Sequence, residues 1–124
     1  MQFQNWIVKT AFLIGSLIVL VQGCEKKMLT KEQIINVANR EFLRQGFELK
    51  EYEVNYDIDN VKSSSRIASI RETSADFAER FNVLVGCDYQ AVEYKRRGKN
   101  IVGGVFWVFV NRKTGEVLTV FGEK

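Results

Sequence analysis

Histidine is absent from this 124-residue sequence, and cysteine is scarce. Without histidine, the chain lacks the usual base of Ser/His/Asp and Cys/His nucleophilic schemes and the commonest protein ligand of zinc. The two cysteines are Cys24 and Cys87, so no disulfide can form between them if Cys24 carries another group. We therefore predict that Cys87 is buried and inert.

The sequence also lacks a large excess of either sign of charge. The chain has 18 basic and 15 acidic residues, and Lys9 is the only charged side chain before Cys24. This balance argues against a general nucleic-acid binder. The acids at 57–60 lack the third oxygen ligand and the glycine of a calcium loop, so we expect no metal and no cofactor. No pair of inward acids is expected on the last strands, and we predict that the protein is not an enzyme.

The longest apolar run extends from Ala11 to Val21, interrupted only by Gly15 and Ser16. Its length is within the roughly 7–15 residues of a signal-peptide core and below the ~20 residues of a membrane-spanning helix. A transmembrane helix is the second interpretation. A buried helix of the folded domain is disfavoured, because the run has no polar face and the chain is too short to enclose it.

The run leads into Val21-Gln22-Gly23-Cys24, which resembles the lipobox of bacterial lipoproteins. In that family the Cys receives a diacylglyceryl group and the bond before it is cut. The resemblance implies a signal peptide over residues 1–23, a lipid on Cys24 that anchors the protein to a membrane, and a place in the bacterial cell envelope facing the periplasm or the exterior. Ordinary secretory cleavage at the same bond, which leaves a soluble protein with a free thiol, is the alternative.

The remaining residues predict a short linker at 24–29 and one small α+β domain over 30–124. A capping box from Thr30 to Gln33 and apolar residues at three- and four-residue spacing predict a helix that ends at Gly46. Alternating polar and apolar residues predict a strand over 52–58. We interpret 60–74 as a mobile loop and 75–81 as a short second helix.

Three strand-like segments follow, at 83–94 in part, 101–110 and 116–121, with turns at 97–100 and 111–115. They favour an antiparallel meander. The expected architecture is therefore an N-terminal helix packed on a curved antiparallel sheet of about four strands. The pair Gly103-Gly104 predicts a bulge or bend.

The strand at 105–110 is apolar on both faces, and one face cannot be covered by the first helix. The second face requires the short helix, a second copy of the protein or a target, because large exposed apolar patches are rare on monomers. We predict partial cover. The remaining groove, edged by Trp107 and by a basic tip at Arg96 and Arg97, would be the site for a protein partner.

The end of the chain supports this expectation. A Gly-Gly pair, an aromatic strand and the turn sequence Asn-Arg-Lys-Thr-Gly-Glu-Val-Leu extend from Gly103 to Leu118. This pattern, with the first helix, resembles small bacterial immunity proteins of the nuclear transport factor 2-like (cystatin-like) fold, which implies a protein that neutralises a toxin by binding it. The hairpin also resembles the PepSY domain, which implies an inhibitory or sensory module of the envelope. A secreted enzyme or small-ligand carrier on the same fold is the third alternative.

Overall fold

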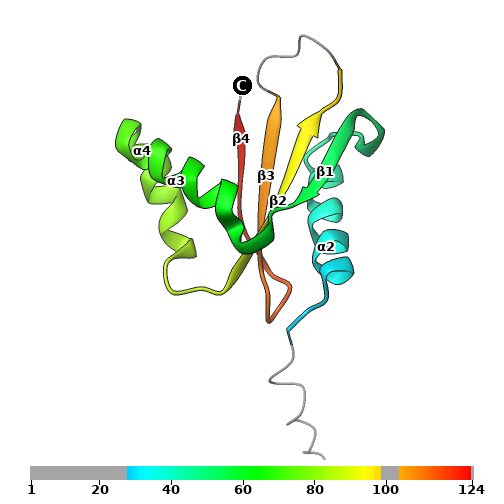
Figure 1. Ribbon diagram of the computed structural model, residues 1–124, viewed down its shortest axis with the longest axis horizontal. Coiled ribbons are helices and arrows are strands. Elements are labelled where there is room, and N and C mark those ends of the chain that lie inside the picture. The colour runs from blue at the N-terminus through cyan, green and yellow to red at the C-terminus, as the bar shows by residue number, and fades with distance from the viewer. Residues whose placement is uncertain (1–27, 99–103, 124) are drawn as a thin grey trace, which may run out of the picture.

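The computed structural model describes residues 28–98 and 104–123. Within these ranges the protein is an α+β domain in which helices pack against a four-stranded antiparallel sheet, as predicted. Helix α2 (Lys31–Arg44) lies on one face of the sheet, and helices α3 (Val61–Thr73) and α4 (Ala75–Arg80) lie on the other (Figure 1). The predicted signal peptide, Cys24 and Gly103 lie outside the described residues.

Helix α2 begins at the predicted capping box. The backbone N–H of Gln33 donates to Thr30 Oγ1 at 3.1 Å, and the backbone N–H of Thr30 donates to Gln33 Oε1 at 2.8 Å. The box satisfies N–H groups that have no partner inside the helix. The fully buried residues of α2 are Ile34, Ala38 and Phe42. Phe42 stacks on the ring of Tyr94, with 4.0 Å between the ring centroids, which fixes the helix over the sheet.

The sheet consists of β1 (Tyr52–Tyr56), β2 (Tyr89–Arg96), β3 (Val105–Asn111) and β4 (Val117–Glu123), in the spatial order β1-β2-β3-β4. The last three strands form the predicted meander. At the turn between β3 and β4, the N–H of Asn111 donates to the carbonyl of Glu116 at 2.8 Å, and Gly115 has a φ of 80°. That left-handed conformation favours glycine.

The pairing of β3 with β4 contains a bulge. Phe109 pairs with Thr119, but Val110 pairs with Val117, so Leu118 is an additional residue on β4. The predicted bulge at Gly103-Gly104 falls partly outside the described residues. Gly104 itself has a φ of 73°.

The interpretation of residues 60–74 as a mobile loop is wrong, because most of them form helix α3. The carboxylate of Asp57 caps its start. Asp57 Oδ1 accepts from the backbone N–H of Lys62 at 3.2 Å, and Oδ2 accepts from that of Ser63 at 2.7 Å. A negative charge at this position also interacts favourably with the helix dipole.

A weak apolar pattern explains the error. Only Ile67 and Ile70 of α3 pack as apolar side chains on the sheet, and the buried residue one turn before Ile67 is the polar Ser63. The chain enters the helix through Asp59 and Asn60, whose φ angles of 56° and 52° lie in the left-handed region that these residue types tolerate. Neither the sparse apolar residues of α3 nor the left-handed turn before it produces the three- and four-residue apolar spacing by which a helix is predicted from sequence.

The protein covers both faces of β3 itself. One face packs on α2, and the other contributes to a second buried cluster under α3 and α4. That second cluster comprises Ile70, Phe81, Leu84, Ala91, Trp107, Phe109 and Phe121. Helix α4 confirms the short second helix expected near 75–81, while α3 supplies cover that the sequence analysis did not foresee. The prediction that the second face is left open beside Trp107 is therefore wrong.

Candidate partner-binding surfaces

Trp107 does not edge an open groove, in contrast to the prediction. Its side chain is 2% exposed and lies in the layer between α3 and the sheet. The narrow space beside it, which Arg66 and Phe121 also line, is too small to hold a water molecule. A partner therefore cannot reach the indole while α3 stays in place.

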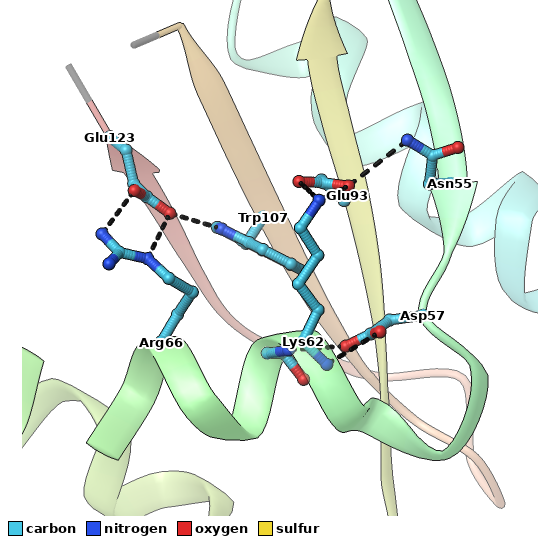
Figure 2. A network of polar contacts seen from close by, with 8 residues as sticks. Asn55, Asp57, Lys62, Arg66, Glu93, Trp107 and Glu123 are labelled. Atoms are coloured by element: carbon cyan, nitrogen blue, oxygen red, sulfur yellow. Dashed lines mark hydrogen bonds and ion pairs between the residues drawn. The ribbon is translucent and has the colours of Figure 1, made fainter. Parts of the chain in front are cut away.

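A buried carboxylate on β2 is held by the start of α3 (Figure 2). Glu93 has a side chain that is only 4% exposed, and its Oε2 lies 2.8 Å from Lys62 Nζ. Its Oε1 accepts from Lys62 Nζ at 3.0 Å and from Asn55 Nδ2 at 3.3 Å. A buried charge is tolerated when it is paired and hydrogen-bonded, and these contacts meet both conditions.

A second ion pair joins α3 to the end of β4. Glu123 accepts from both the Nη2 and the Nε of Arg66, at 2.6 Å and 3.3 Å. The same carboxylate accepts from Trp107 Nε1 at 2.8 Å. The indole N–H is thus satisfied inside the protein, which removes the penalty of burying it.

The two ion pairs together hold α3 against the sheet. Lys62 and Arg66 are four residues apart on α3 and therefore lie on the same side of the helix. They hold acids on β2 and β4, on either side of the strand that carries Trp107 (Figure 2). The expectation of no inward pair of acids on the last strands is therefore wrong. Both carboxylates are engaged by cations of α3, and we conclude that they fasten α3 to the sheet.

No cluster among the described residues has the arrangement of a metal site. In residues 28–98 and 104–123, no group of three or more Cys, Asp or Glu side chains is placed to hold a metal ion. Burial raises the pKa of the Tyr94 hydroxyl, which donates a hydrogen bond to Asn39 Oδ1 at 2.7 Å. Tyr94 therefore stays protonated and structural.

The basic tip lies at the end of β2 and is exposed, as predicted. Arg96 Nη2 is 3.8 Å from Glu51 Oε1, and both side chains are about half exposed. Arg97 is tied to the start of β1, because its Nε donates to the carbonyl of Tyr52 at 3.2 Å. Exposed ion pairs of this kind are weak, so Arg96 can exchange its partner for another anion.

The two predicted roles for cysteine have different outcomes. Cys24, the proposed lipidation site, lies outside the described residues. Cys87 is half-buried rather than buried, and its Sγ donates to the carbonyl of Val83 at 3.3 Å. The thiol lies between the short 3-10 helix at Phe81–Leu84 and β2.

The outer edge of β4 is a further candidate that the sequence analysis did not identify. β4 is the last strand of the sheet, and no described segment pairs with its outer side. Two open grooves, of about 570 and 350 Å³, lie along this edge and share Val117 in their lining. One groove extends over α2 at Arg40, and the other extends to Arg80 on α4. We call this region the β4 edge.

No family model, curated protein or solved structure matches the chain. Among the described residues, no helix combines the length and the apolar character that a membrane crossing requires.

Proposed function

We propose that this protein is a cell-envelope lipoprotein, anchored through a lipid on Cys24, whose folded domain binds another protein without acting as an enzyme. Binding is supported by the finding that the buried apolar faces and buried carboxylates of the described domain are already satisfied by contacts within the domain. Both sheet faces are covered by its helices, and the carboxylates of Glu93 and Glu123 are held by cations of α3. What remains for function is the outer surface, where arginines line shallow grooves.

Contacts at the start of the domain support a particular orientation of the domain relative to the membrane. The backbone N–H of Leu29 donates to the carbonyl of Arg112 at 2.9 Å, so the beginning of the domain is attached to the turn between β3 and β4. Figure 1 shows both at the same end of the sheet, opposite the end of β2. The chain from Cys24 to Leu29 spans at most roughly 17 Å. A lipid on Cys24 would therefore keep the β3–β4 turn near the membrane and direct the basic tip away from it.

An immunity role is the specific form of binding that we propose, with a toxin as the partner. Its support is the resemblance of residues 103–118 to the end of small immunity proteins, together with an α+β domain that has a helix before the sheet. The proposed location is the bacterial envelope, facing the periplasm or the exterior.

The neighbouring gene provides the first test. We expect a toxin reading frame directly upstream, whereas a protease or a two-component sensor in that position would favour the PepSY-like role instead. Titrating the purified toxin with this protein then separates binding from catalysis. A binder abolishes toxicity at a fixed molar ratio, and the loss of toxicity should be complete when the toxin is saturated. Neutralisation by amounts far below the toxin concentration, increasing with time, would show an enzyme and refute the proposal.

A further inference from the structure

The β4 edge has the properties of a docking site for an extended polypeptide. We propose that the partner adds a segment with acidic side chains to the outer side of β4, as a fifth strand of the sheet. This proposal deepens the proposed function. It rests on that function only in one respect, namely that the partner is a protein.

The sequence of β4 favours this use of the edge. Residues 117–122, Val-Leu-Thr-Val-Phe-Gly, contain no charged side chain and no proline. Proteins commonly protect an exposed edge with such residues, because unpaired backbone N–H and C=O groups attract other strands. Beyond the bulge at Leu118, the pairing of β4 with β3 is regular from Thr119 to Glu123. That stretch is long enough to offer backbone hydrogen bonds to an added strand.

The charges around the edge select an acidic occupant. The two grooves are lined by three arginines, Arg40, Arg44 and Arg80, and by one acid, Glu41. Glu41 is already engaged, because Arg44 Nη2 donates to its Oε2 at 2.6 Å. Among the described residues, neither Arg40 nor Arg80 forms an ion pair, and both are exposed. Arg80 lies over the ring of Phe77, 5.2 Å from its centroid, which leaves its charge without a described anion. The positive charge of both arginines is therefore available to an anionic ligand.

The same charges disfavour a second copy of the protein. If two β4 strands paired edge to edge, Arg40 and Arg80 of one chain would approach the arginines of the other. Like charges brought together across an interface oppose association. A heterologous acidic segment brings no such repulsion.

A peptide experiment tests this assignment without the natural partner. The full chain, labelled with ¹⁵N and held in detergent micelles, is titrated with a short peptide of repeated Val-Val-Asp-Asp, which presents aspartates on both faces of an added strand. We expect saturable shifts centred on the amides of residues 119–123. A valine–lysine peptide and an N-methylated valine–aspartate peptide, which cannot donate backbone hydrogen bonds, should both bind more weakly. Absence of binding, or equal binding by all three peptides, would overturn the proposal.

Charge-reversal variants locate the site. Arg40→Glu and Arg80→Glu should each weaken binding of the acidic peptide about fivefold, the effect of an exposed charge pair. Arg96→Glu at the basic tip is the matched control and should leave binding unchanged. If Arg96→Glu weakened binding more than Arg40→Glu and Arg80→Glu, the binding site would lie at the basic tip. If the protein instead formed a concentration-dependent dimer that shifts the same amides without peptide, the β4 edge would be assigned to a second copy. Neither result depends on lipidation or on a toxin, so the proposed function is tested separately.

Discussion

Replacing Trp107 with alanine provides a direct test of the architecture around α3. Trp107 is the largest of the fully buried side chains, and it packs between α3 and the sheet within the second buried cluster. Truncating a buried tryptophan to alanine typically costs about 3–5 kcal/mol of folding free energy. A domain of this size has about 5–15 kcal/mol in total. We expect the urea midpoint of unfolding to fall steeply, or the domain to lose its cooperative transition.

Trp107→Phe is the matched control for this experiment. Phenylalanine keeps a buried ring but cannot donate to Glu123, which retains its contacts with Arg66. We expect a smaller loss of about 1–3 kcal/mol, because one acceptor loses a hydrogen bond and a small space opens. Far-UV circular dichroism in urea measures both variants without relying on tryptophan emission. An unchanged midpoint for Trp107→Ala, together with weaker partner binding, would show that the indole lies at the surface and would refute the burial argument.

Three further substitutions test other contacts. Lys62→Met should destabilise the domain by about 1–3 kcal/mol in urea unfolding, because buried Glu93 loses its cation, and adding Glu93→Gln should recover part of the loss. Arg44 lowers the pKa of Glu41 below its ordinary value of 4.5. The pair therefore contributes stability above pH 4.5 that is lost as the pH falls through the lowered pKa, and Arg44→Gln should reduce this fall in thermal unfolding. Thr30→Ala should cost about 1 kcal/mol by calorimetry, whereas Thr30→Ser should cost little.

Local sequence patterns were sufficient for the elements whose signals are themselves local. The capping box at Thr30 and the apolar spacing that follows predict α2, and the turn at 111–115 predicts the last hairpin. Helix α3 could not be predicted in this way. Its start depends on the Asp57 carboxylate and on a left-handed turn, and its packing depends on two isoleucines and a buried serine.

The candidate surfaces likewise divide into features that local sequence patterns predict and features that depend on the tertiary fold. The apolar character of both faces of β3 predicts that each needs cover, and the exposed basic tip is visible as a run of charges. Which side chains stay accessible depends on where α3 lies, so the burial of Trp107 could not be read from the sequence. The β4 edge is likewise a result of topology. The last strand is an outer strand because β1 pairs with β2 rather than with β4.

Metabolic labelling with palmitate is the most direct test of the claim that this domain works from a lipid anchor. The wild-type chain and a Cys24→Ser variant are expressed in a bacterial host, immunoprecipitated and compared for incorporated label and apparent mass. Lipidation at Cys24 predicts label in the wild type only, with the variant remaining as an uncleaved precursor. Equal labelling of the two proteins, or an unlabelled wild type cleaved after Gly23, would contradict lipidation at Cys24.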